Sequence, residues 1–158
     1  MRGSILEIKV KVGDPAPDFE GQTAEGIRLG LKDFVGKKNV VLYFYPKDDT
    51  PGCTKEACSF RDNLQSLRSL DTEIVGVSVD GVESHKKFIT KYRLNFPLIS
   101  DKEKHIARAY GVLKDTRTST NRVTFLIDRN GKVAKIFPKV DVTKHTDEVM
   151  ATLRELST

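Results

Sequence analysis

The two cysteines of this chain, Cys53 and Cys58, are the side chains whose type and spacing most clearly promise chemistry. Cys53 directly follows Pro51 and Gly52. Because proline is favoured at the first position of a helix, we expect a helix to begin near Pro51 and to hold Cys53 in its first turn. The first N–H groups of a helix have no partners within it and carry the positive end of its dipole, so they can hydrogen-bond a thiolate. The position therefore predicts a nucleophilic cysteine.

Charged and polar neighbours should modify this nucleophile. Asp48 and Asp49 precede it, and like charge near a sulfur disfavours the thiolate, so a cation is needed nearby. Arg122 is the best placed by topology, because it starts a strand that can lie beside the strand leading into the cysteine loop. Thr50, three residues before Cys53, carries a hydroxyl that can donate to the sulfur or accept from a substrate O–H group.

A bond between the two sulfurs would require a change of conformation. Five helical residues rotate Cys58 by about 140° and displace it by about 7.5 Å from Cys53, which places the Cα atoms roughly 8 to 9 Å apart. A disulfide tolerates at most about 7 Å. The start of the helix, or the segment around Cys58, must therefore unwind before such a bond forms. Burial as a small apolar side chain is the alternative role, which stays open for Cys58.

Other arrangements of reactive side chains are poorly supported. A zinc site needs two ligands besides the cysteines, and the three histidines offer no paired spacing. His85 and His145 lie on apolar helical stripes, which predicts structural histidines, and His105 lies beside such a stripe. We therefore expect no metal and assign no histidine to catalysis, which also weakens a cysteine–histidine hydrolase.

Hydrophobic periodicity predicts the elements that position these residues. Residues 39–45 form a continuously apolar run typical of a strand buried on both faces, and the apolar spacing over 54–67 is that of an amphipathic helix. The same reading gives a second buried strand at 73–79, a helix carrying the stripe of His85, Phe88, Ile89 and Tyr92, a short strand at 97–99, a short helix at 102–110, strands at 122–127 and 132–137, and a final helix. Asn130-Gly131 predicts a type I′ turn between the last two strands. Asp141 or Thr143 should cap the final helix, with Val149, Leu153 and Leu156 facing inward.

This order of elements is that of an α/β thioredoxin-like fold, with a central mixed sheet flanked by helices and a right-handed crossover between the parallel strands. Without repeats or linkers, residues 1–158 should form a single domain. Cys53 then lies where a central strand leads into a helix, the usual place for a site in an open α/β sheet.

Composition narrows the range of functions. The 158 residues include 38% hydrophobic and 31% charged side chains, enough for one packed core. The formal net charge is +5, but the basic residues are scattered among acidic ones, so we expect no specific nucleic-acid binding. No run is apolar enough for a membrane helix, and the N-terminus has no signal-peptide pattern. We expect a cytoplasmic protein in a reducing compartment, whose two cysteines serve chemistry rather than a disulfide framework.

The residues around the cysteines resemble those of the peroxiredoxin family. Pro46, Thr50 and Cys53 match the pattern Pro-x-x-x-Thr-x-x-Cys, and Arg122 begins Arg-Val-Thr-Phe-Leu-Ile-Asp, which is similar to the arginine-bearing strand of that family. The string Gly-Cys-Thr-Lys-Glu-Ala-Cys, which ends at Cys58, most resembles the bacterioferritin comigratory protein, or Q-type, branch. The likeness extends over nearly the whole chain.

The resemblance implies a thiol peroxidase of the peroxiredoxin type of thioredoxin-like fold, acting on hydrogen peroxide and alkyl hydroperoxides without a cofactor. Cys53 would be the peroxidatic cysteine and would pass through a sulfenic acid. Thr50, Gly52 and Arg122 would bind the peroxide, and Pro46 would shield the pocket.

The rest of the implied cycle depends on Cys58. Its spacing makes it a plausible resolving cysteine, forming an intrachain disulfide with Cys53 that a thioredoxin-like dithiol reduces. The resemblance favours a monomer, and a dimer remains open. Two other functions fit the same fold. A thiol-disulfide oxidoreductase would have only two residues between its cysteines. A redox-regulated chaperone would use its cysteines only to change the state of a binding surface.

Overall fold

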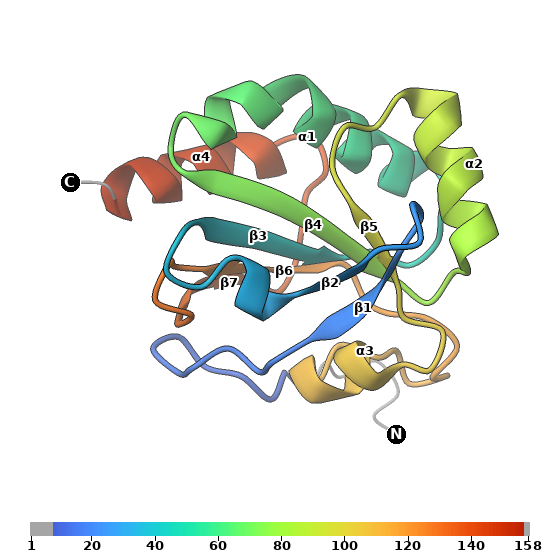
Figure 1. Ribbon diagram of the computed structural model, residues 1–158, viewed down its shortest axis with the longest axis horizontal. Helices are drawn as coiled ribbons and strands as arrows, with labels where there is room; N and C mark the ends of the chain where they lie inside the picture. The colour runs from blue at the N-terminus through green and yellow to red at the C-terminus, as the bar shows by residue number, and fades with distance from the viewer. Residues whose placement is uncertain (1–7, 157–158) are drawn as a thin grey trace.

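A seven-stranded mixed sheet with the order β2-β1-β5-β4-β3-β6-β7 forms the middle layer of the computed structural model, which describes residues 8–156 (Figure 1). Helices α1, α2 and α4 cover one face of this sheet and α3 covers the other (Figure 1). The strands are β1 Glu20–Thr23, β2 Arg28–Gly30, β3 Asn39–Phe44, β4 Thr72–Ser78, β5 Leu98–Ser100, β6 Val123–Ile127 and β7 Val133–Phe137. The helices are α1 Pro51–Arg68, α2 Val82–Tyr92, α3 His105–Tyr110 and α4 His145–Leu156, with a short 3₁₀ turn at Leu31–Asp33.

Strand β3 lies at the centre of the sheet, parallel to β4 on one side and antiparallel to β6 on the other. Its side chains alternate between the two apolar layers: Tyr43 packs toward α1 and Phe44 toward α3. The register pairs Phe44 with Val123, so Arg122 lies beside the carboxyl end of β3. This confirms the expected mixed sheet and the expected placement of Arg122 next to the cysteine loop.

The N-terminal hairpin formed by β1 and β2 is an element that the sequence did not indicate. Its strands are short, and the segment 20–23 consists of polar residues and a glycine, so no apolar run marks it. Pairing of β1 with β5 nevertheless extends the sheet at this edge. The hairpin is therefore held by long-range pairing rather than by local propensity.

Three local predictions were wrong. The turn between β6 and β7 is not type I′, which needs positive φ at both central residues; of Asn130 and Gly131 only Gly131 has it, at 80°. Helix α3 begins at His105 rather than at 102. The Asp101 carboxylate accepts hydrogen bonds from the amides of Ile106 and Ala107 in the first turn of this helix. Leu156 is 49% exposed, because the last turn of α4 projects beyond the ends of the strands (Figure 1). In residues 8–156, no helix is both long enough and apolar enough to cross a membrane.

Candidate active site

The first turn of α1 positions Cys53. Helix α1 begins at Pro51 as predicted, with Thr50 in extended conformation as its N-cap residue. The Cys53 side chain is 1% exposed and faces the core together with Ala57 and Phe60. The Thr50 hydroxyl donates to the carbonyl of Lys47 at 2.9 Å. Because this bond uses the only hydrogen of the hydroxyl, Thr50 cannot also donate to the sulfur. Its lone pairs can still accept a hydrogen bond from a substrate O–H group.

Arg122 joins the sulfur to a buried carboxyl group. Its Nη1 donates to Cys53 Sγ at 3.3 Å and to Oε1 of Glu56 at 2.9 Å. Burial disfavours the charge on Arg122, yet Cys53 and Glu56 outweigh it and raise the pKa of the guanidinium. A permanent cation therefore contacts Cys53, as the sequence predicted.

Glu56 is the site residue that the sequence analysis missed. Its side chain is fully buried, and burial raises its pKa to about 7 although Arg122 acts in the opposite direction. Among the described residues, neither Glu56 Oε2 nor the buried hydroxyl of Tyr43 has a hydrogen-bond partner. The available signal was its position three residues after Cys53, which puts an acid on the face of the helix that is otherwise apolar.

Asp48 and Asp49, which the sequence sets against the thiolate, each have hydrogen-bond partners other than Cys53. The Asp48 carboxylate accepts from the hydroxyl of Tyr45 and contacts Nδ1 of His85, and Asp49 accepts from Nζ of Lys91 at 2.9 Å. Both carboxylates are thus satisfied by groups other than the cysteine loop. The sequence could not show this, because the partners on α2 are more than thirty residues away.

The remaining predicted site residues occupy the same end of the sheet. Pro46 is half-buried two residues after the end of β3, and Cys58 is half-buried in the second turn of α1. Both cysteines are free thiols, and the helix between them is continuous. Unwinding must therefore precede any bond between their sulfurs, as their spacing predicted.

The structural assignment of the histidines holds for two of them. His85 is fully buried with both ring nitrogens bonded, and His145 is buried with Nε2 bonded to Thr124 Oγ1 at 2.7 Å. Burial, reinforced by Arg122, lowers the pKa of His145 to about 4, so its ring is neutral at physiological pH. His105 is exposed at the start of α3.

Gly52 matters because it lets the guanidinium approach the helix. A Cβ atom at this position would lie 2.9 Å from Nη2 of Arg122 and 3.5 Å from its Cζ. We expect Gly52→Ala to displace Arg122 and to slow the reaction of Cys53 with an electrophile about tenfold, since small misplacements of a catalytic group are costly. Stopped-flow rates of Cys53 oxidation would check this. Gly81→Ala, at a position where a Cβ atom meets nothing closer than 3.6 Å, is the matched control, and equal rates for both variants would contradict the assignment.

The raised pKa of Glu56 predicts a pH-dependent stability. The folded protein binds the Glu56 proton more tightly than the unfolded chain, whose pKa is near 4.5. The stabilisation is therefore complete below the unfolded pKa and is lost as the pH rises through about 7. At about 1.4 kcal/mol per unit, wild type should lose a few kcal/mol between about pH 5 and pH 8 relative to Glu56→Gln. Urea unfolding of both proteins at each pH measures this difference in the free energy of unfolding. His145 titrates in the opposite direction, but it is present in both proteins, so its contribution cancels. Parallel curves would contradict the prediction.

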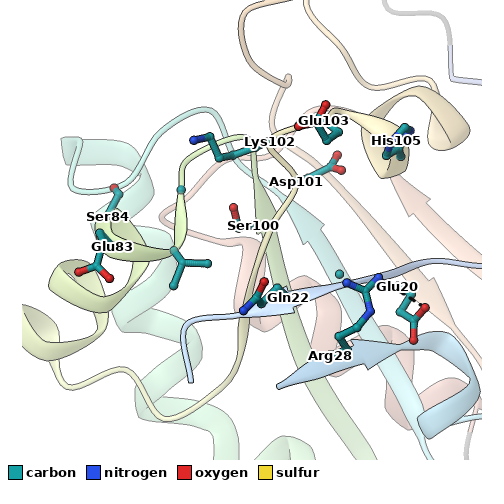
Figure 2. A pocket seen from close by; sticks show the side chains of 13 residues that line it. Glu20, Gln22, Arg28, Glu83, Ser84, Ser100, Asp101, Lys102, Glu103 and His105 are labelled. Atoms are coloured by element: carbon teal, nitrogen blue, oxygen red, sulfur yellow. Dashed lines mark ion pairs between the residues drawn. The ribbon is translucent and has the colours of Figure 1, made fainter. Parts of the chain in front are cut away.

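A separate hollow of about 530 Å³ lies at the N-terminal end of α2, between the β1–β2 hairpin and the loop after β5 (Figure 2). Its side chains carry both signs of charge, and one pair, Glu20 and Arg28, forms an ion pair of 3.5 Å across the hairpin (Figure 2). Neither cysteine lines it. This hollow is therefore distinct from the cysteine site.

Comparison with known proteins points to one family. Residues 12–136, which contain the whole cysteine site, match the AhpC/TSA family. Peroxiredoxin Bcp of Bacillus subtilis is 44% identical over 154 residues, covering 94% of this chain and 98% of the relative. Peroxiredoxin Bcp of Escherichia coli is 37% identical over 92% of this chain and 97% of its own length.

Solved structures agree with these sequences. A PrxQ mutant from Xylella fastidiosa superposes with a TM-score of 0.90 at 29% identity, covering 96% of this chain and 100% of that one. The bacterioferritin comigratory protein of Xanthomonas campestris, studied for alkyl peroxide reduction through trapped intermediate and ligand complexes, gives a TM-score of 0.85 at 32% identity, over 96% of this chain and 100% of that one.

Proposed function

This chain belongs to the AhpC/TSA family and is a thiol peroxidase of the Bcp and peroxiredoxin Q type, and we propose that Cys53 is the residue that attacks the peroxide. The observation that carries this assignment is the pair of hydrogen bonds from one nitrogen of Arg122 to Cys53 and Glu56. The thiol-disulfide oxidoreductase and the redox-regulated chaperone give way to the peroxidase, because the relatives are peroxiredoxins along nearly the full chain.

In the proposed reaction, the Cys53 thiolate attacks the terminal oxygen of a hydroperoxide. The S–O bond forms as the O–O bond breaks, which leaves Cys53 as a sulfenic acid and releases hydroxide or alkoxide, which takes up a proton. Arg122 and the free amides of the first turn stabilise negative charge on the two oxygens, while Thr50 accepts from the peroxide O–H group. Because this charge develops in the transition state, these groups accelerate the reaction rather than only bind substrate.

Several further assignments belong to the same proposal. Pro46 and Gly52 border the peroxide, which is hydrogen peroxide or an alkyl hydroperoxide. Cys58 attacks the sulfenic sulfur, releasing water and forming an intrachain disulfide after the start of α1 unwinds. A thioredoxin-like dithiol reduces this disulfide, with no cofactor. We place the reaction in the cytoplasm and expect a monomer.

Cys58→Ser tests the second half of the cycle. The variant should oxidise Cys53 at the wild-type rate in the first turnover and then stall, because the sulfenic acid has no thiol partner. Mass spectrometry after one equivalent of peroxide should find a loss of two hydrogens in wild type and one added oxygen in Cys58→Ser. Continued turnover of the variant with a dithiol would assign resolution to another route.

A further inference from the structure

The loop between β3 and α1 is fixed to α2 by a buried cluster of polar side chains that the proposed reaction does not use. The side chains of His85 and Asp48 are 0% and 3% exposed, and His85 Nδ1 lies 2.7 Å from Asp48 Oδ2. The hydroxyls of Tyr45 and Ser84 donate to the same carboxylate at 2.6 and 2.7 Å. We call these four residues the Asp48 clamp.

The contacts of the two ring nitrogens of His85 require a proton between His85 and Asp48. Nε2 of His85 lies 3.0 Å from the carbonyl of Ile99, which can only accept, so Nε2 carries hydrogen. If Nδ1 and Oδ2 both lacked a proton, two lone pairs would face each other at 2.7 Å. The contact is therefore a buried hydrogen bond that holds one proton between the imidazole ring and the carboxyl group.

The next residue of the loop is held more weakly. Asp49 accepts from Lys91 and from the Tyr92 hydroxyl, but this contact is exposed. Asp49 also has a φ of 56°, a left-handed conformation that costs energy for a residue with a side chain. The firmly held part of the loop thus ends at Asp48, and the chain becomes easier to move from Asp49 onward.

We propose that the Asp48 clamp sets the balance between the folded cysteine site and the unwound form in which Cys58 reaches Cys53. The inference rests on the proposed function. Thr50 and the first turn of α1 follow Asp48 directly, so the clamp fixes the segment that places Thr50 and Cys53 against Arg122. While the clamp holds, peroxide meets an assembled site. Loss of the clamp frees the loop to move with the helix start, which favours the unwound form.

His85 is accordingly a positioning residue, since its ring contacts Asp48 and Ile99 rather than the reacting sulfur. Ser84 offers a milder way to weaken the clamp. It stands on the first turn of α2 beside the polar hollow (Figure 2), where a smaller side chain leaves no buried gap. Removing its hydroxyl takes one of three hydrogen-bond partners from the Asp48 side chain and leaves the contacts with Tyr45 and His85.

The test separates two rates within one turnover. Reduced protein is mixed with one equivalent of hydrogen peroxide and quenched at intervals, and mass spectrometry counts thiol, trapped sulfenic acid and disulfide. His85→Leu should slow Cys53 oxidation about tenfold or more and speed disulfide formation, because a buried carboxylate without its partner cannot keep the loop in place. Ser84→Ala should shift the ratio of the two rates the same way by about threefold, and it covers the case that His85→Leu does not fold.

Ile127→Ala is the matched control. Ile127 is a fully buried residue of β6. It pairs with Val40 at the start of β3, far from the loop between β3 and α1, so its truncation lowers stability without touching that loop. Both rates of this variant should stay within about twofold of wild type. The clamp proposal is overturned if Ser84→Ala and His85→Leu give the same ratio of Cys53 oxidation rate to disulfide formation rate as Ile127→Ala. It is also overturned if both rates fall together. Wild-type protein that forms neither sulfenic acid nor disulfide would instead refute the proposed function itself.

Discussion

Cys53→Ser should reduce peroxide consumption to the rate of the buffer, a loss of at least about a thousandfold, because a serine hydroxyl at this position stays protonated and is a far weaker nucleophile than a thiolate. The change replaces one atom in a fully buried side chain, so the fold should be retained. Arg122 and Glu56 keep their mutual hydrogen bond in the variant. The measurement is peroxide decay with a dithiol reductant, alongside far-ultraviolet circular dichroism.

Cys58→Ser provides the contrast for this result, since it retains one thiol on the same helix. It should consume one equivalent of peroxide, whereas Cys53→Ser should consume none. If Cys53→Ser consumed peroxide stoichiometrically through Cys58, the roles of the two cysteines would be reversed. The half-buried position of Cys58, away from Arg122, argues against that outcome.

Arg122→Met should slow the first oxidation step by about 100- to 1000-fold, the effect typical of removing a preorganised donor from a developing charge. The thiol would lose the cation at 3.3 Å from its sulfur, and peroxide would lose its strongest donor. Arg122→Lys should recover only part of the rate, because an ammonium group cannot reproduce the rigid planar fork of donors. Stopped-flow oxidation of reduced protein measures all three forms.

Loss of stability could also slow Arg122→Met, since Glu56 would remain buried without its partner. The double variant Arg122→Met with Glu56→Gln separates the two effects. A neutral amide tolerates burial better than a carboxylate, so the double variant should regain much of the stability. Its oxidation rate should stay low. A rate that returned with stability would show that Arg122 acts only through the fold.

The sequence was sufficient for those parts of the site that depend on local signals. Pro51 marked the start of α1, and the apolar runs marked β3, β4 and β6. The antiparallel pairing of β6 with β3 brings Arg122 to the cysteine. A strand buried on both faces leaves a continuous apolar pattern, and a helix start leaves a proline. These signals survive without knowledge of tertiary contacts.

The features of the site that could not be predicted from the sequence depend on contacts between residues far apart in the chain. Asp48 and Asp49 looked like charges opposed to the thiolate, but both are bound by side chains of α2. Their partners belong to a helix beyond the next strand, and no local pattern connects them. Glu56 was overlooked for a different reason. An acidic side chain is usually solvated, and only the contact with Arg122, which directly precedes β6, accounts for its burial.

Helix α1 is longer than the part of it that holds the two thiols. Its later residues Phe60, Leu64 and Leu67 are buried in the layer beneath α4, so we expect them to stay anchored when the first turns open in the proposed cycle. The opened segment therefore rewinds onto an existing helical end, which requires only elongation and avoids the unfavourable nucleation step. Elongation takes on the order of nanoseconds per residue, so we expect rewinding of α1 in the proposed cycle to add no delay to turnover.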